Sequence, residues 1–466
     1  MSGKKETFIE TVTEESKTTF LRQSGWIALA TAIGGAASFA VHIIAKDLPK
    51  AEYGIFTTIL QILNLMAIPA IGIQTVVSKK IAAAKTAEDN LQILAAEKYY
   101  KKTAMALCLA LIPIFVLTVQ PIEQSLQTNN PGVVFTLYVS GFMALLIPCG
   151  LGVLQGKQAF YWLGIGLASL GVSRLTLIYL MHLFSYDPAQ TVEPEFTITR
   201  VMWALMLSYA FTFYFVWKST FEYFDWGKII KKVKFDWKSW VSSILPLSIG
   251  GGTVIYLMSV DMVFVQRYFD KDQTGLYAAA GMIGRALIFF VGPMVAVMFP
   301  KLVKSHAEQK PTDVLRFTLL LTACLCAAAI VLGVLVPDLP LRMIYDESFL
   351  QVTALVPWFI AAMTPLALAA VLVNNILARC TTNSVYLLLA VPIIHTCVLC
   401  VAAPQIANQT VGTFNVHAYI SMVQLIGMGN LFFLASTVIL NWGVTRQEKL
   451  QTIMDENPSP DVEEEH

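Results

Sequence analysis

Residues 25–45 read GWIALATAIGGAASFAVHIIA, a stretch without Lys, Arg, Asp or Glu. An α-helix rises about 1.5 Å per residue, so about 20 apolar residues suffice to cross the hydrocarbon core of a bilayer. Stretches of this kind recur along the chain of 466 residues, which is 56% apolar and only 14% charged. Soluble domains carry about 25% charged residues. The composition therefore excludes a soluble enzyme and predicts an all-α integral membrane protein.

Apolar runs bounded by charges or by Pro and Gly predict about 12 transmembrane helices. In the first half of the chain they cover residues 25–45, 54–78, 103–119, 132–154, 159–183 and 201–217. In the second half they cover residues 240–265, 275–299, 317–336, 352–377, 384–402 and 418–440. Pro69 and Pro246 lie within two of these runs, where the missing N–H of proline interrupts helical hydrogen bonding.

The positive side chains orient the chain in the membrane. Cytoplasmic loops carry an excess of Lys and Arg. If the helices cross alternately, 24 of the 32 Lys and Arg fall on the side of the two termini and 6 fall on the other side. We therefore expect both termini to be cytoplasmic. The Lys-rich segments 79–102 and 228–238 are expected to contact anionic lipid headgroups on that side.

The two halves of the chain resemble one another when they are overlaid. Gly54 then pairs with Gly275, and Lys79 pairs with Lys301. Each half has six predicted helices, an even number, so both halves enter the membrane from the same side. The repeat is then parallel, with a pseudo-two-fold axis along the membrane normal, and transporters with such an axis place the substrate path between the halves.

The predicted fold is thus two parallel six-helix bundles, and the chain is predicted to divide into five segments. They are a cytoplasmic N-terminal tail (1–24), an N-terminal six-helix half (25–217), a basic cytoplasmic linker (218–239), a C-terminal six-helix half (240–441) and a cytoplasmic C-terminal tail (442–466). The first tail is polar and lacks the small-residue cleavage pattern of a signal peptide, so we expect it to be retained.

Three segments carry a resemblance to a known family. They are EYGIF (52–56) with IGIQTVVSKKIA (71–82), VDMVFVQRYF (260–269) with DQTGLYAAAGMIGRA (272–286) and FPKL (299–302), and VLQGKQ (153–158). Here the chain resembles the polysaccharide flippases of the Wzx-type O-antigen and polysaccharide transporter family. That family belongs to the multidrug/oligosaccharidyl-lipid/polysaccharide exporter superfamily.

The resemblance implies a transporter, not an enzyme, in the bacterial cytoplasmic membrane. Its cargo would be an undecaprenyl-pyrophosphate-linked oligosaccharide, which is flipped to the outer leaflet by alternating access for export of a cell-surface polysaccharide. The implied partners are this lipid-linked oligosaccharide, membrane lipids and other polysaccharide-assembly proteins.

Two arginines, Arg285 and Arg174, lie well inside predicted spans. A charged side chain at the middle of a bilayer costs about 2.5–3.5 kcal/mol on insertion scales, so it should face a polar interior or a partner. A guanidinium stays charged and grips phosphate oxygens with two parallel hydrogen bonds. Both arginines are therefore candidate ligands for an anionic cargo. The alternative is internal pairing with an acid or with helix carbonyls.

Asp261 and His42 are the candidate ion-coupling residues. Asp261 is the one acid well inside a predicted span, and Arg267 follows it near the end of that span. It would act either as a proton carrier or as a fixed ion-pair partner. His42 falls near Asp261 when the halves are overlaid, and histidine is the other side chain suited to respond to protons.

Amide side chains form a second group of substrate-binding candidates. They are Asn64, which aligns with Arg285 in the overlay, Gln74 and Asn374. Amides within transmembrane helices commonly hydrogen-bond across helices, and they would bind sugar hydroxyls with the same groups. A role in helix packing and a role in substrate binding are both possible interpretations of these residues.

No catalytic, metal or cofactor site is predicted. The seven cysteines lie in or next to apolar stretches without the paired spacing of a zinc or haem site, so we expect packing residues. The sequence has no GxxxxGK[ST] loop for ATP, and a proton or sodium gradient is therefore the expected energy source. It also has no strongly basic or acidic domain that would bind nucleic acid.

Two other function classes stay open. A multidrug extruder of the same superfamily would share the fold, but its cationic cargo calls for more acids than arginines in the membrane. A membrane-embedded polysaccharide polymerase or ligase would need a large extracytoplasmic loop with catalytic residues. The longest such loop, residues 185–200, has only Asp187, Glu193 and Glu195 as acids.

Overall fold

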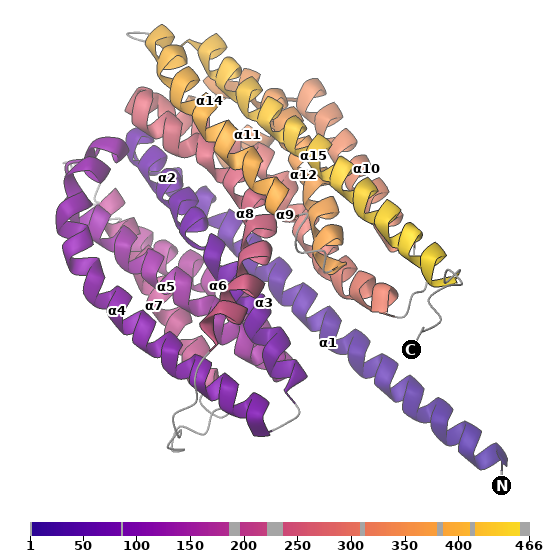
Figure 1. The fold of residues 1–466 in the computed structure, drawn as a ribbon. Helices are drawn as coiled ribbons and strands as arrows, with labels where there is room; N and C mark the ends of the chain where they lie inside the picture. Colours follow the sequence, from indigo (N-terminus) through magenta and orange to yellow (C-terminus); the bar gives the residue numbers. More distant parts are fainter. Residues whose placement is uncertain are drawn as a thin grey trace, which may run out of the picture.

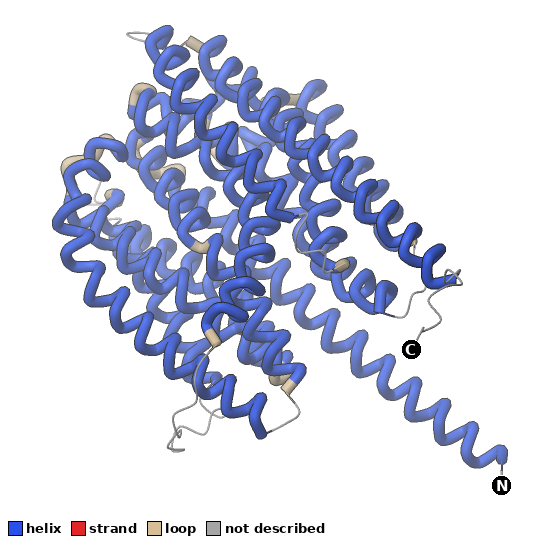
Figure 2. The backbone as a smooth tube through the Cα atoms, viewed as in Figure 1, coloured by secondary structure: helices blue, strands red, loops and turns tan. Residues whose placement is uncertain are grey.

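The computed structural model describes residues 2–84, 87–185, 196–220, 236–307, 313–379, 385–410 and 415–456. Within these residues the chain is helical and has no strand (Figures 1 and 2). The first half contains α1 (Ser2–Ala45), α2 (Lys50–Met66), α3 (Ile68–Ala83), α4 (Ala87–Leu126), α5 (Pro131–Gly156), α6 (Phe160–Ser185) and α7 (Ile198–Thr220). The second half contains α8 (Trp237–Tyr268), α9 (Lys271–Ala307), α10 (Val314–Leu335), α11 (Leu339–Ile344), the 3-10 helix η2 (Glu347–Leu355), α12 (Val356–Ala378), η3 (Tyr386–Leu389), α14 (Ala390–Ala407), η4 (Asn408–Thr410) and α15 (Val416–Glu456).

Helices long enough to cross a membrane account for most of the described chain. Eleven helical segments are long and apolar enough to do so, and the bent pair formed by α2 and α3 supplies a twelfth. Each coincides with one of the predicted spans, so the multi-pass membrane fold is confirmed. Some helices are longer than predicted, and the part of α4 that could cross a membrane is Lys102–Leu126.

The second predicted span, residues 54–78, is broken into two helices. α2 and α3 meet at Ala67 with a bend of 41°. Pro69 lies in the first turn of α3, where it cannot donate a hydrogen bond to a carbonyl of α2 and where its ring crowds the preceding turn. The interruption predicted at Pro69 is thus confirmed, whereas α8 runs on through Pro246 without ending.

The packing of helices repeats from one half to the other. In the first half α1 packs on α6, α3 on α5, α5 on α7 and α4 on α5. In the second half the corresponding helices pack in the same way, with α8 on α14, α9 on α12, α12 on α15 and α10 on α12. The two parallel six-helix bundles predicted from the sequence overlay are therefore confirmed.

Both bundles start at the same end of the molecule. We call the end at which α1 begins the amino face. The other end, where residues 46–49, 127–130 and 269–270 connect helices, is the opposite face. In Figure 1 α1 begins at the lower right, and α15 also ends toward that side.

The boundaries of the five predicted segments stay predictions. Most of the basic linker lies outside the described residues, because 221–235 are not among them. The last residues of the C-terminal tail, 457–466, also lie outside them. The structure extends α1 through residues predicted as a tail, from Ser2 onward.

A glycine contact joins the two bundles where α2 crosses α9. Gly54 and Gly275, which pair in the sequence overlay, lie against one another: a Cβ added to Gly54 would be 3.0 Å from the Gly275 nitrogen. A Cβ added to Gly275 would be only 2.0 Å from the Lys50 carbonyl oxygen. The approach of the two backbones therefore requires glycine at position 275.

Gly275→Ala should lower the free energy of unfolding by about 1–3 kcal/mol, the usual cost of overpacking. The added methyl group would overlap the Lys50 carbonyl, so α2 and α9 must move apart. Thermal unfolding of the purified protein in detergent measures the change. Gly292→Ala on the same helix is the matched control, because nothing lies within 4 Å of its added Cβ. Equal stability of the two variants would contradict the close packing.

Candidate functional site

A buried ion pair joins α8 to α9. Asp261 on α8 is 0% exposed and Arg285 on α9 is 2% exposed. Arg285 Nη2 donates to Asp261 Oδ2 at 2.5 Å, and Arg285 Nε donates to the Met258 carbonyl oxygen at 2.9 Å. The guanidinium carbon also lies 5.9 Å from the centroid of the Phe359 ring on α12. In this conformation Arg285 is thus paired internally, and its contact with a substrate stays a prediction.

The partner of Asp261 is this arginine and not Arg267, the arginine nearest to it in sequence. Six residues along a helix turn a side chain to a different face, and Arg267 is exposed near the end of α8. Arg267 Nη1 instead donates to Ser125 Oγ at 3.0 Å.

One oxygen of Asp261 has no partner. The Tyr277 hydroxyl donates to Oδ2 at 3.0 Å, so both hydrogen bonds of the carboxylate fall on the same oxygen. Oδ1 is buried and makes no hydrogen bond within the described residues. A buried acceptor without a donor costs about 1–3 kcal/mol, more when it is charged. Oδ1 is therefore the atom at which a proton or a cation would relieve the largest cost.

A row of hydrogen-bonded rings connects the two bundles beside this pair. His42 Nδ1 lies 2.9 Å from the Tyr53 hydroxyl, which lies 2.8 Å from the Tyr345 hydroxyl. All three side chains are buried. Arg285 is close enough to act electrostatically on each of them. The row thus links α1 and α2 of the first bundle to the connection before η2 in the second.

The two bundles hold their candidate coupling groups by similar contacts, although the two tyrosines involved do not coincide in the overlay. In each bundle the first helix carries the group and the next span supplies a tyrosine hydroxyl. His42 on α1 bonds Tyr53 on α2, and Asp261 on α8 bonds Tyr277 on α9. The overlay of His42 on Asp261 therefore corresponds to a similar local arrangement, although ion coupling by either residue stays a prediction.

Arg174 is a buried cation on α6. It is 9% exposed, its Nη2 donates to the Tyr209 hydroxyl at 3.2 Å, and its guanidinium carbon lies 5.5 Å from the Tyr209 ring centroid. Its Nε has no hydrogen-bond partner. No carboxylate of the described residues forms an ion pair with it, so Arg174 carries an uncompensated charge there. Its charge also reaches His42.

The three candidate amides do not join this charged group. Asn64 donates to Gln61 Oε1 at 3.3 Å on the same helix, and Asn374 donates to the Ala370 carbonyl at 2.8 Å. Gln74 donates to Gln155 Oε1 at 3.5 Å, between α3 and α5. All three are only partly buried, and sugar binding by them stays a prediction.

Polar contacts close the opposite face between the two bundles. Lys46 Nζ lies 2.8 Å from Asp346 Oδ1, and Lys50 Nζ donates to the Ser348 carbonyl at 3.2 Å. Tyr53 follows Lys50 by three residues and Tyr345 directly precedes Asp346, so the Tyr53–Tyr345 hydrogen bond joins the same two segments. These contacts tie the start of α2 to the segment between α11 and η2.

A second set of closing contacts involves two glutamines. Gln127 Nε2 donates to the carbonyl oxygens of Gln266 and Phe269, each at 2.7 Å. In return Gln266 Nε2 donates to the Leu126 carbonyl at 2.8 Å. The amides thus satisfy backbone carbonyls at the ends of α4 and α8, where helices leave such groups unpaired.

The tyrosines at the site are not singled out by the sequence. Tyr53 directly precedes Gly54, and Tyr277 follows Gly275 by two positions. The glycine pair in the overlay was therefore the one available signal for this place in the fold. Among the described residues, no group of three or more His, Cys, Asp or Glu side chains is arranged to hold a metal ion.

Comparison with known proteins identifies the fold. No protein-family model matches the chain, and no curated protein matches it. An inward-facing multidrug resistance MATE family transporter of the MOP superfamily matches with a TM-score of 0.61 and 14% identity, over 90% of this chain and 96% of that one. The lipid II flippase MurJ, in an inward closed conformation, matches with a TM-score of 0.63 and 11% identity, over 94% and 93%.

A third similar structure is a MOP superfamily transporter from Pyrococcus furiosus, described as having a binding pocket of reverse polarity. It matches with a TM-score of 0.57 and 13% identity, over 92% of this chain and 96% of that one. At these identities the similarity establishes the fold. The chain has the fold of MOP superfamily transporters, which include drug extruders and a lipid flippase.

Removing the acid of the buried pair should destabilise the protein strongly. Asp261→Leu leaves Arg285 buried and unpaired, and we expect a loss of about 3–5 kcal/mol in the free energy of unfolding. Thermal or denaturant unfolding in detergent measures it. The double variant Asp261→Leu/Arg285→Met should recover most of the loss, because it removes the unpaired charge as well.

The exposed ion pair between Asp338 and Arg342 provides the control for this measurement. Asp338→Leu should leave the stability nearly unchanged, because exposed ion pairs contribute little. A double variant no more stable than Asp261→Leu would show that the buried charges are not coupled.

Proposed function

We propose that the chain is a transporter that flips an undecaprenyl-pyrophosphate-linked oligosaccharide across the membrane by alternating access of its two bundles. The observation that carries the proposal is Arg174, a buried cation with no counter-charge among the described residues. Such a charge is costly in a membrane protein unless an anion joins it. A pyrophosphate supplies that anion and matches the paired donors of a guanidinium.

Arg285 provides a second cation when Asp261 is neutralised. A protonated Asp261 no longer balances the guanidinium, and an anionic cargo then replaces it as the partner of Arg285. Asp261 Oδ1 is the atom that receives the proton, because it has no hydrogen bond to lose. Proton binding and phosphate binding are thereby linked, so the protonated carboxyl and the bound anion belong to the same state of the transporter. A sodium ion at Oδ1 would have the same effect.

The closing contacts support alternating access as the mode of transport. Ion pairs between exposed side chains contribute only about 0–1 kcal/mol, and Lys46 and Asp346 are partly exposed. Contacts of this strength hold the opposite face shut and can still be broken when the bundles move. At the Gly54–Gly275 contact itself, neither residue has a side chain that interlocks α2 with α9.

The orientation and surroundings follow from the basic residues. We place the amino face and both termini in the cytoplasm of a bacterial cell, because 24 of the 32 Lys and Arg fall on that side. Asn64, Gln74 and Asn374 are proposed contacts to sugar hydroxyls. Other polysaccharide-assembly proteins are the proposed partners.

Extrusion of a cationic drug is the second candidate function. Asp261 Oδ1 favours it, because a buried carboxylate oxygen without a donor would also bind a cation. MATE transporters among the similar structures are consistent with it. The two candidate functions differ in the sign of the cargo's charge, so a substitution of Arg174 distinguishes them.

Arg174→Gln should reduce flipping of a fluorescent undecaprenyl-pyrophosphate-linked oligosaccharide about tenfold or more in reconstituted vesicles. A hydrogen bond to a charged group contributes about 1.5–3 kcal/mol, which corresponds to at least that factor. Leaflet accessibility of the fluorophore measures the rate against empty vesicles, under a proton gradient and a sodium gradient.

Arg316→Gln is the matched control, because the Arg316 side chain on α10 is 88% exposed. The flipping rate of this variant should equal that of the wild type. Flipping no faster than in empty vesicles, across several glycans and under both gradients, would rule out the proposed cargo. Gradient-driven export of a cationic dye by the same preparation, unchanged in Arg174→Gln, would instead establish the second candidate.

A further inference from the structure

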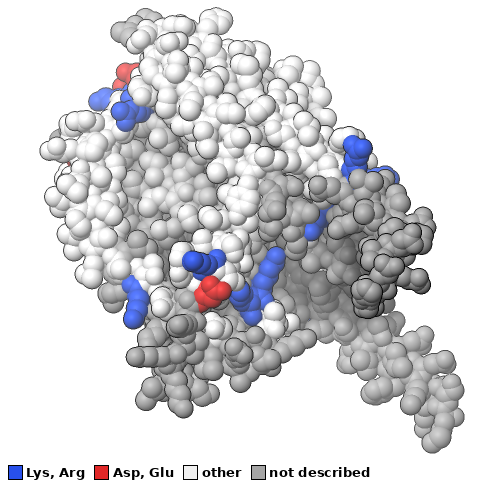
Figure 3. Space-filling model, viewed as in Figure 1, with Lys and Arg blue, Asp and Glu red and all other residues white. Residues whose placement is uncertain are grey.

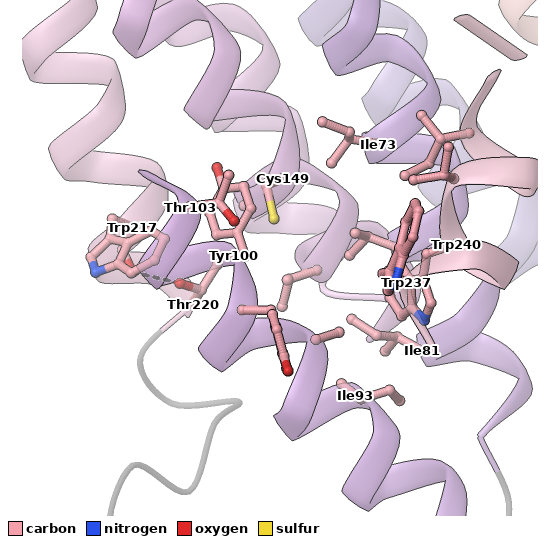
Figure 4. Close-up of a pocket in the computed structure, with 17 residues that line it drawn as sticks. Ile73, Ile81, Ile93, Tyr100, Thr103, Cys149, Trp217, Thr220, Trp237 and Trp240 are labelled. Carbon is pink, nitrogen blue, oxygen red and sulfur yellow. Dashed lines mark hydrogen bonds between the residues drawn. The ribbon is translucent and has the colours of Figure 1, made fainter. Parts of the chain in front are cut away.

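A cavity of about 340 Å³ lies apart from the charged site, between α3, α4, α5 and α7 of the first bundle and α8 of the second. Its wall is aliphatic and aromatic, as Figure 4 shows. Ile73 and Ile81 of α3 face it together with Trp237 and Trp240 of α8. It is therefore built partly from each bundle.

Two hydroxyl groups in the wall are bonded within the protein. The Tyr100 hydroxyl donates to the Leu146 carbonyl at 3.1 Å, and Thr220 Oγ1 donates to the Trp217 carbonyl at 2.7 Å. Burial raises the pKa of the Tyr100 phenol, so this hydroxyl keeps its proton. A mainly apolar wall of this kind is suited to a hydrocarbon chain.

The depth of the cavity matches part of one lipid leaflet. Ile73, Val77 and Ile81 lie on one face of α3, at intervals of four residues. The eight residue steps from Ile73 to Ile81 rise about 12 Å, against about 15 Å for half of the hydrocarbon core. The two tryptophans of α8 lie at its first turns, where aromatic residues mark the interface with water.

Lysines surround the cavity at the amino face. Lys80 Nζ lies 5.4 Å from the centroid of the Trp240 ring, and Lys79 beside it is exposed. Lys102, Lys218 and Lys238 are exposed and directly adjoin lining residues in the chain. In Figure 3 several Lys and Arg lie over the lower part of the molecule, and others lie at its upper left and on its right side. An anionic headgroup is therefore stabilised at the mouth of the cavity.

We propose that this cavity binds one acyl chain of an anionic phospholipid, with the lipid phosphate at Lys79 and Lys80. The charge of the mouth and the apolar wall together select an anionic lipid over a zwitterionic one. The cavity is too small for the whole polyprenyl tail of the proposed cargo, and it is separate from Arg174 and Arg285. Because α8 forms one wall, the bound chain packs between the two bundles.

Native mass spectrometry of the detergent-purified protein tests the proposal with an equal mixture of phosphatidylglycerol and phosphatidylcholine. One phosphatidylglycerol should remain on the wild-type protein at collision energies that remove phosphatidylcholine. Val153→Trp, which fills the cavity, should lower the retained fraction about tenfold. Thr103→Trp should do the same from an exposed lining position, where a larger side chain leaves the core of the protein intact.

Two further variants separate the parts of the site. Leu117→Trp on α4, 78% exposed and outside the cavity, should retain the lipid as the wild type does. The double variant Lys79→Ala/Lys80→Ala should abolish the preference for phosphatidylglycerol over phosphatidylcholine. Equal retention of the two lipids by the wild type, or undiminished retention by Thr103→Trp, would overturn the proposal.

Discussion

The cost of placing charge in hydrocarbon is the constraint on which the rest of this structure depends. It leaves very few charged side chains within the spans, and it determines what those few must do. Asp261 and Arg285 meet this cost by pairing, which fixes α8 against α9 and brings the guanidinium over Phe359 of α12. A buried pair of this kind is seldom more stabilising than apolar residues of the same volume. The pair is therefore no evidence of extra stability.

Much of the fold could be predicted because the signals that determine it are local. The apolar run at 25–45 and its counterparts need only composition and length to be identified as spans. Pro69 marks the break between α2 and α3, since the loss of an N–H acts within one turn. The overlay of Gly54 on Gly275 predicted the repeat that the helix contacts then confirm.

The pairing within the site could not be predicted in the same way. Asp261 and Arg285 lie on different helices, and their contact depends on how α8 and α9 are rotated about their axes. Sequence proximity pointed to Arg267, which lies on another face of α8. Closure by Gln127 and Gln266 likewise depends on where two helix ends meet in space. The charge of the cargo is harder still to predict from the sequence, because drug extruders and a lipid flippase share one fold.

The contact between Gly54 and Gly275 has a consequence for the history of the chain. In a dimer of identical subunits, a symmetric interface presents the same residue from both sides. Each substitution would then appear twice. Joining the two copies in one polypeptide removes that restriction, so the halves can diverge one position at a time. In the present chain the two halves differ close to these glycines, because one half bonds a histidine to its tyrosine and the other bonds an aspartate. A single carboxylate at this place is an asymmetry that a dimer of two identical subunits could not have.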